Sequence, residues 1–182
     1  PQQSLQDDEL INDDQSSETF NWLQERLGLN DEHLIDLAKR FSKVRILSIE
    51  EQLQPTLDWL QQRLGLKDEM LGELVQRQPT ILDLSIQDYL EPNISWLQER
   101  LELDQESLQR VILRLTPMVG GLAQLLGSNM KENFEPTLTW LQERLSLDEK
   151  SLRKLIKRFP SLLGYSIEDN LAPTLTWLEE CL

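Results

Sequence analysis

The chain has 182 residues, a formal net charge of −14 and a single cysteine. Six acidic residues and no Lys or Arg lie within the first eighteen positions, and the rest of the chain is acidic as well. This charge disfavours nucleic-acid binding, which normally goes with a basic surplus, and one cysteine excludes a disulfide framework. No run of 18 apolar residues and no signal or transit segment is visible, so no transmembrane helix is expected.

Residues 1–18 are interpreted as an acidic extended segment, and residues 19–182 as an array of repeats. All five tryptophans fall in one motif, W-L-Q-E-R-L or a close variant, spaced by 37, 37, 44 and 37 residues. Self-similarity at a fixed period is the signature of repeat architectures. The 44-residue interval contains an insertion around Pro117. The units begin near Thr19, Pro55, Pro92, Pro136 and Pro173.

Each unit predicts helices in a fixed order. The first helix follows a proline, which loses nothing at the first helical position, and ends near a glycine such as Gly65. The second helix is stopped by a further proline such as Pro160, and a short third helix follows, with capping-box patterns that start at Ser48, Ser85 and Ser166. The second helices begin close to Asp31, Asp68, Asp104 and Asp148, which can cap free N–H groups. One unit cannot bury its apolar face alone, so we expect an all-α helical-repeat solenoid of about four 37-residue units, right- or left-handed.

The stretch KRFPSLLGYSIEDNLAPTLTWLEECL, residues 157–182, resembles the repeat of the mitochondrial transcription termination factor (mTERF) family, and the resemblance covers about Thr19 to Leu182. It implies a superhelical array in a protein of mitochondria or chloroplasts. It also implies binding of double-stranded DNA or RNA along a basic concave face, in organellar transcription, RNA processing or ribosome assembly. The chloroplast is slightly favoured, because the family is expanded in plastid-bearing organisms.

Two groups of basic residues are candidates for an anion or nucleic-acid patch. The stronger group falls within about 140° of one helix circumference, opposite the apolar face. Lys and Arg could neutralise phosphates there, or the group could be a solvated helix face that compensates neighbouring acids. The stronger group is Lys150, Arg153, Lys154, Lys157 and Arg158, and the weaker is Lys39, Arg40, Lys43 and Arg45.

The motif tryptophans could stack on bases, but a tryptophan at one position of every repeat favours a structural core between repeats. These residues are Trp22, Trp59, Trp96, Trp140 and Trp177. The motif arginines are expected to pair with local acids or to cap a neighbouring repeat. The insertion contains a small apolar stretch that could dock a partner. Its candidate residues are Met118, Val119, Leu122, Leu125 and Leu126.

No constellation predicts catalysis, a metal site or a cofactor. His33 is the lone histidine and is expected at the surface, and Cys181 has no partner that would activate it. We therefore predict a non-catalytic scaffold for protein–protein interaction, a small subunit or assembly factor of a larger organellar complex. The alternative is an mTERF-type regulator that binds nucleic acid in organellar transcription or RNA metabolism.

Overall fold

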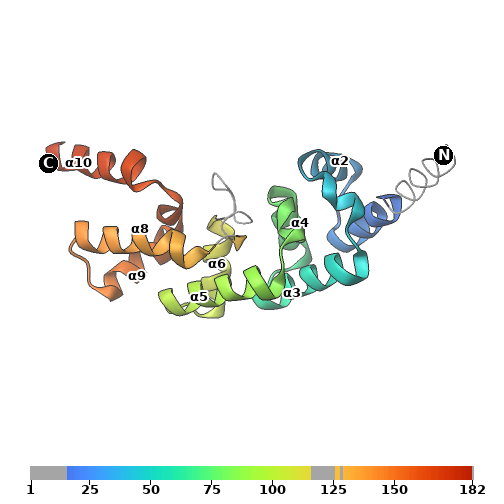
Figure 1. Cartoon of the computed structure of the whole chain (residues 1–182), viewed down its shortest axis with the longest axis horizontal. Helices are drawn as coiled ribbons and strands as arrows, with labels where there is room; N and C mark the ends of the chain where they lie inside the picture. The colour runs from blue at the N-terminus through green and yellow to red at the C-terminus, as the bar shows by residue number, and fades with distance from the viewer. Residues whose placement is uncertain (1–15, 116–125, 128, 182) are drawn as a thin grey trace, which may run out of the picture. The chain divides into compact units, whose positions relative to one another are not determined.

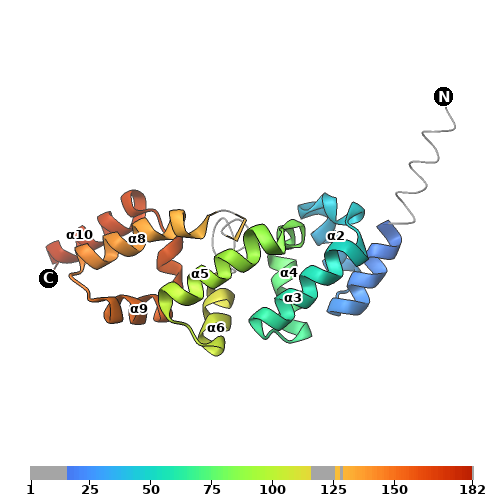
Figure 2. The ribbon, with the colours of Figure 1, turned by 60° about the horizontal axis from the view of Figure 1, so that its bottom comes forward.

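The computed structural model describes residues 16–115, 126–127 and 129–181, and all regular structure within them is helical (Figure 1, Figure 2). This confirms the predicted all-α, helical-repeat fold. The chain divides into two compact units between Ile86 and Gln87. The helix that carries the tryptophan motif is called helix A below, and the helix that follows it is called helix B.

The first unit holds the first repeat and the second repeat as far as Ile86, and both repeats follow one order of elements. Helix A is followed by helix B, by a short 3-10 helix and by a single π-helical turn. The first repeat has a helix over residues 16–27, α2 (Asp31–Arg40), η1 (Ser42–Ile46) and η2 (Ile49–Leu53). The second has α3 (Gln54–Leu64), α4 (Asp68–Arg77), η3 (Pro79–Asp83) and η4 (Ile86–Leu90).

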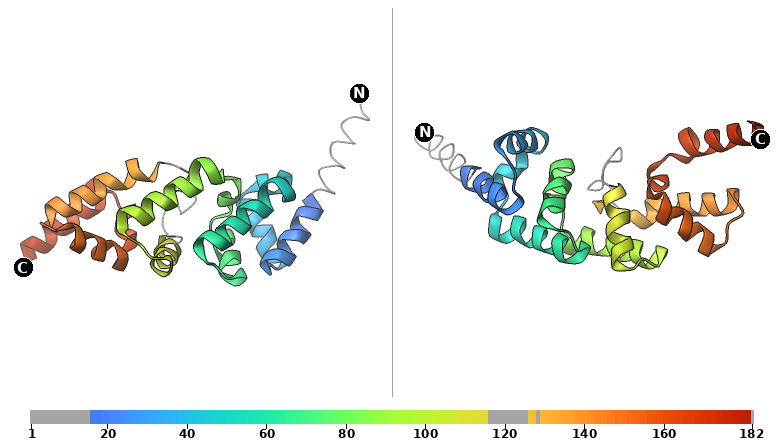
Figure 3. Two further views of the ribbon diagram at one scale, coloured as in Figure 1. Left: turned by 90° about the horizontal axis from the view of Figure 1, so that it is seen from below. Right: turned by 180° about the vertical axis from the view of Figure 1, so that it is seen from behind.

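The second unit repeats this order, and Figure 3 allows its helices to be followed from two further sides. The third repeat has α5 (Glu91–Leu101) and α6 (Gln105–Leu115). The fourth has α8 (Met130–Arg144), α9 (Glu149–Arg158), η5 (Pro160–Gly164) and η6 (Ile167–Leu171), and α10 (Ala172–Cys181) carries the last tryptophan motif. Helix α5 packs against α8 and α9, and α6 packs against η5, so the fourth repeat covers the third.

Helix A ends the same way in all four complete motifs, with a left-handed residue six positions after the tryptophan. Gly28 and Gly65 have φ of 65° and 64°, a conformation that glycine adopts without steric cost. Glu102 and Ser146 occupy the same position with φ of 47° and 51°. The last two repeats therefore keep the left-handed turn despite a side chain that disfavours it.

Helix B begins with a side-chain cap in the first, third and fourth repeats, although the capping residue differs, and α4 of the second repeat has none. Asp104 accepts from the backbone N–H of Ser107 at 2.8 Å, and Asp148 accepts from that of Ser151 at 2.7 Å. In the first repeat the cap is Asn30 instead, and it forms a capping box with His33. The side chain of each residue accepts a hydrogen bond from the backbone N–H of the other. The prediction that Asp31 caps this helix is thus wrong by one residue. Asp68 accepts from Arg26 and Gln61 rather than from its own helix.

Prolines mark helix boundaries as predicted, with one exception. Pro55 and Pro92 lie in the first turns of α3 and α5, whereas Pro136 lies inside α8. Pro79 and Pro160 follow helix B and begin 3-10 helices that the sequence pattern did not predict. Two short helices therefore connect helix B to the next helix A, where one was expected. Ser48 and Ser166 cap the second of them.

Leucines form the centre of the core, and the tryptophans lie at its edge. The residue after each of the first four motif tryptophans is a buried leucine, for example Leu60 and Leu97. The tryptophans themselves are half-buried in the first four motifs, and Trp177 is 61% exposed. This corrects the expectation that they form the repeat core. An indole ring is wide and carries an N–H that needs a polar partner, so it fits the rim better than a leucine does.

Candidate functional site

The stronger basic group lies on α9, and two of its five members contact the end of α5. Arg153 forms an ion pair with Glu102, and it lies 3.8 Å from Glu149. Lys157 donates through Nζ to the backbone carbonyl of Glu102 at 2.8 Å. Lys150, Lys154 and Arg158 are exposed. The fourth repeat therefore uses part of this group to hold the third.

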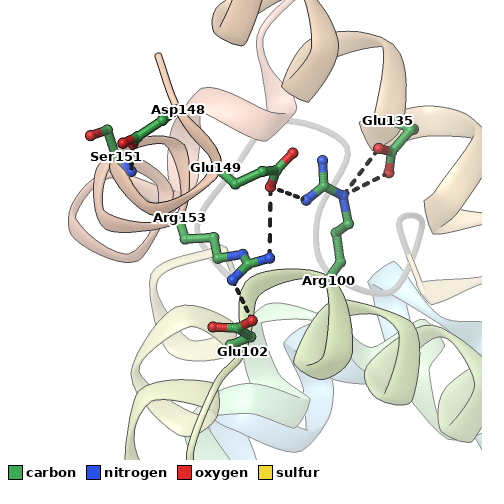
Figure 4. A network of polar contacts seen from close by, with 7 residues as sticks. All are labelled: Arg100, Glu102, Glu135, Asp148, Glu149, Ser151 and Arg153. Carbon is green, nitrogen blue, oxygen red and sulfur yellow. Dashed lines mark hydrogen bonds and ion pairs between the residues drawn. The ribbon is translucent and has the colours of Figure 1, made fainter.

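Figure 4 shows how the contacts of Arg153 join a wider network in the second unit. The Arg100 guanidinium contacts Glu135 with Nε at 3.0 Å and Glu149 with a terminal nitrogen at 2.9 Å. Glu149 lies between Arg100 and Arg153 and contacts both. Burial alone would lower the pKa of Arg100, but the hydrogen bonds and charges of the two glutamates raise it. The hydrogen bond from Arg100 lowers the pKa of Glu149, against an opposing effect of burial.

Three of the motif arginines, Arg26, Arg100 and Arg144, bridge to the element that follows their repeat, as predicted. Arg26 contacts Asp58 on α3 at 3.2 Å and Asp68 on α4 at 3.0 Å. Arg144 forms an ion pair with Glu179 on α10. Arg100 makes the equivalent contacts with helices A and B of the fourth repeat. These arginines fasten neighbouring repeats and are partly shielded from solvent, so they are poorly placed to bind a phosphate.

A second set of arginines caps the C-terminus of helix B in the next repeat. Arg40 donates to the carbonyls of Gln76 and Arg77 at 2.6 and 2.7 Å. Arg114 stands at the same repeat position, 18 residues after the tryptophan, and donates to the carbonyl of Arg158 at 2.7 Å. The last carbonyls of a helix have no partner within it, and cationic side chains satisfy them well. This capping was not predicted, although the recurrence of arginine at one position signals it.

The weaker basic group of the first repeat is likewise engaged within the first unit. Arg40 makes the capping bonds to α4 and also contacts Asp36. Lys43 pairs with Asp83 of the second repeat at 2.9 Å, and Arg45 lies over the ring of Phe20. Lys39 is exposed.

A hollow of about 790 Å³ beside α8 is lined by the half-buried Trp140. Its walls carry Glu132, Glu135 and Glu143 as well as Lys131. Arg100 pairs with Glu135, but Glu132 and Glu143 still outnumber Lys131 in the walls, so this tryptophan is an unfavourable platform for nucleic-acid bases.

The insertion lies almost entirely outside the described residues, including Met118, Val119, Leu122 and Leu125. Leu126 is described and is fully buried, so it contributes to the core instead of an exposed docking surface. Its carbonyl accepts from the Asn93 amide at 2.6 Å, and the Asn93 side-chain oxygen accepts from the backbone N–H of Met130 at 3.1 Å. Asn93 thereby anchors the segment after the insertion to α5. The sequence pattern did not reveal this role.

Within the residues that the structure describes, no helix is long and apolar enough to cross a membrane. The same residues contain no cluster of three or more His, Cys, Asp or Glu that could hold a metal ion. His33 is half-buried in the capping box of α2, and Cys181 is exposed at the end of α10.

The fold and the contacts between repeats define a helical-repeat protein in which arginines bridge neighbouring repeats within each compact unit. The model of the mTERF family matches residues 21–182, nearly the whole chain, and the chain therefore belongs to the mTERF family. A search of curated proteins finds no match to it.

Proposed function

We propose that this mTERF-family chain is a non-catalytic scaffold that binds other proteins, as a small subunit or assembly factor of a larger complex in a chloroplast or mitochondrion. The observation that carries the proposal is the engagement of its candidate cations. Four of the nine, Arg40, Lys43, Arg153 and Lys157, contact acids or carbonyls of a neighbouring repeat. They hold the array together, and a phosphate would have to displace those contacts.

Charge supports the same conclusion. Non-specific affinity for nucleic acid comes from cations that neutralise phosphates and release counterions. A net charge of −14 generates a long-range field that repels a polyanion before any local contact forms. The acidic walls around Trp140 add to this repulsion at the place where a base could stack.

The second candidate function is binding of nucleic acid, which the family favours. One observation supports it, since Lys150, Lys154 and Arg158 are exposed along α9. Three cations on one helix can contact a phosphate backbone locally, although they make few phosphate contacts for an acidic chain.

The test is the size of the native assembly that contains the chain. Organellar extract is treated with nuclease or left untreated, and the chain is followed by native electrophoresis. The scaffold function predicts an assembly far larger than 21.3 kDa that persists after nuclease treatment. Collapse to the free chain after nuclease treatment would favour the nucleic-acid function. Migration as the free chain in both samples would refute the scaffold.

A further inference from the structure

The hollow beside α8 is lined by three side chains that make no polar or ring contact with any other described residue. The indole of Trp140 has no hydrogen bond, ring contact or cation–π contact among those residues. The carboxylates of Glu132 and Glu143 are exposed and form no ion pair with them. The walls come from α8, from its cap Asn129 and from Ile167 of η6, so the hollow lies between successive elements of the second unit.

The exposed part of the Trp140 ring belongs to the repeat itself. Trp22, Trp59 and Trp96 are half-buried too, although a complete repeat follows each of them. In the third repeat the chain covers the indole from within, because the ring of Phe134 lies 6.3 Å from that of Trp96. Leu171 stands at the position of Phe134 in the next repeat, six residues before the following tryptophan. The π-face of Trp140 thus lacks an aromatic neighbour among the described residues, and an indole face attracts a cation.

The acids of the hollow differ from the acids that join the repeats. At the contacts between repeats a cation of the neighbouring repeat meets each carboxylate, as Arg100 does for Glu135 in the wall of the hollow. Glu132 and Glu143 have no such cation. Lys131 also lines the hollow, but it is exposed and forms no ion pair among the described residues. The hollow therefore presents negative charge and a π-face that the described part of the chain does not satisfy.

The spacing of the two carboxylates defines what can satisfy both. Glu132 and Glu143 are eleven residues apart on α8, about 16 Å along the helix axis at about 1.5 Å per residue. Oxygen ligands bind a metal ion within about 2.6 Å, so the pair cannot share one ion. Two separate cations are needed instead. Pro136 and Ile167 add apolar wall surface, which suits the aliphatic stems of Lys and Arg.

We propose that this hollow binds a basic segment of a partner protein. One arginine of the segment lies against the indole of Trp140 and pairs with Glu143, which is one helical turn away. A second cation, about five residues along the segment, pairs with Glu132, since five extended residues span about 17 Å. A chain of net charge −14 attracts a basic segment from a distance and repels both nucleic acid and a second copy of itself. The inference rests on the proposed scaffold function and assigns it a surface and a class of partner.

The probe is a fluorescently labelled peptide, GRSGSGRG, with GQSGSGQG as its uncharged control. Binding to the full chain is measured by anisotropy at about 100 mM salt, where a Debye length of about 10 Å screens distant acids. The indole N–H signals in a ¹H–¹⁵N spectrum locate the peptide, and Trp140→Leu identifies the signal of Trp140. We expect saturable binding that shifts this signal, and no binding of the uncharged peptide.

Two variants and a matched control test the assigned contacts. Glu132→Gln with Glu143→Gln is expected to weaken binding about fivefold, the combined contribution of two exposed ion pairs. Trp140→Leu keeps an apolar side chain but removes the π-face, and is expected to weaken binding about threefold. The control is Glu50→Gln with Glu69→Gln, which removes the same charge from exposed side chains of the first unit and is expected to leave binding unchanged. Thermal unfolding of each variant checks that it folds.

Several outcomes overturn the proposal. The peptide fails to bind, it leaves the Trp140 signal in place, or it binds the two double variants equally well. A linear diamine that binds as tightly as the peptide would show that the hollow recognises charge alone. Self-association of the purified chain that Trp140→Leu abolishes, measured by sedimentation, would identify a second copy as the occupant.

The native assembly separates this proposal from the scaffold function. In nuclease-treated extract, the large assembly is expected with the unaltered chain and with the control variant. It is not expected with a variant that combines Glu132→Gln, Trp140→Leu and Glu143→Gln. An assembly that survives in all three leaves the scaffold function standing and refutes the hollow as its docking surface. An assembly absent from all three refutes the scaffold function itself.

Discussion

At the left-handed position that ends helix A, the last two repeats carry a residue other than glycine, which is the residue that suits this conformation best. Ser146 holds φ of 51° where the first two repeats use glycine. A residue with a Cβ pays a steric cost of about 1–2 kcal/mol in this conformation. Replacing it with glycine removes that cost, but glycine loses more conformational entropy on folding, which cancels part of the stabilisation. We expect Ser146→Gly to raise the free energy of unfolding by about 0.5–1 kcal/mol, measured by urea denaturation.

Glu102→Gly is the instructive comparison for that prediction. It relieves the same backbone conformation, but it removes the carboxylate that pairs with Arg153. Its net effect should therefore fall below that of Ser146→Gly. Equal stabilisation by the two substitutions would mean that the ion pair contributes nothing. No gain from Ser146→Gly would contradict the account of the turn.

Glu149 makes a stability contribution that depends on pH. Its pKa lies below the ordinary value of 4.5 because it accepts a hydrogen bond from Arg100. A carboxyl with a lowered folded-state pKa stabilises the fold above its unfolded pKa, and this contribution is lost as pH falls through the folded value. We expect Glu149→Gln to lower the free energy of unfolding near pH 7, with a difference from the unaltered chain that shrinks below about pH 4.5.

Urea unfolding at a series of pH values between about 3 and 7 measures this difference. Glu106→Gln is the control, since Glu106 is exposed and, among the described residues, pairs with Arg110 alone, one turn along its own helix. If the difference in unfolding free energy between Glu149→Gln and the unaltered chain stays constant down to pH 3, ionisation of the Glu149 carboxylate does not contribute to stability.

At the scale of the elements, the arginine cap of helix B is predicted to stabilise the contact between repeats. Arg114 satisfies the carbonyl of Arg158 at the end of α9. We expect Arg114→Gln to reduce the free energy of unfolding by about 1 kcal/mol, the net contribution of a charged hydrogen bond at an exposed site. Arg110→Gln, on the same helix, should change it by less than about 0.5 kcal/mol. Equal effects in urea denaturation would rule out a specific cap.

Helix α4 approaches the preceding helix A so closely that a methyl group does not fit. A Cβ built on Gly72 would lie 2.8 Å from the backbone oxygen of Leu27. Alanine at this position raises helix propensity by about 1 kcal/mol but forces the two helices apart. We expect Gly72→Ala to destabilise the chain by about 1–3 kcal/mol in thermal or urea unfolding. A stabilised variant would show that the helices separate without cost.

The residue of the fourth repeat that is equivalent to Gly72 shows why the periodicity of a single helix was not enough to predict the role of the basic group on α9. Arg153 stands where Gly72 stands in the second repeat, and it reaches Glu102 at the end of α5. Helical periodicity predicts that Arg153 lies opposite the apolar face of α9, and in the structure its side chain is half-buried. Periodicity could not show that this face meets the preceding repeat, because it describes one helix and carries no information on its neighbours.

At the scale of the whole molecule, the repeat was readable from the sequence because one motif recurs with its tryptophan, leucine and arginine. That recurrence predicted the helical-repeat fold, the helix order and the bridging role of the motif arginines. It missed the 3-10 turns after helix B and the continuation of α8 through Pro136. Those features depend on packing between repeats. The exposure of Phe159 was missed for the same reason, since the equivalent residues of the first and third repeats, Phe41 and Leu115, are buried.

The proposed scaffold function requires that the chain's cations bind acids and carbonyls of neighbouring repeats and do not bind a polyanion. Its most direct test is titration of labelled duplex DNA and RNA with the purified chain at about 20 mM and about 200 mM salt. A matched variant changes Lys150, Arg153, Lys154, Lys157 and Arg158 to Gln. We predict no saturation at micromolar protein even at the lower salt, where electrostatic attraction is strongest. Sub-micromolar binding that falls steeply with salt and disappears in the variant would contradict it and establish the chain as a nucleic-acid-binding protein.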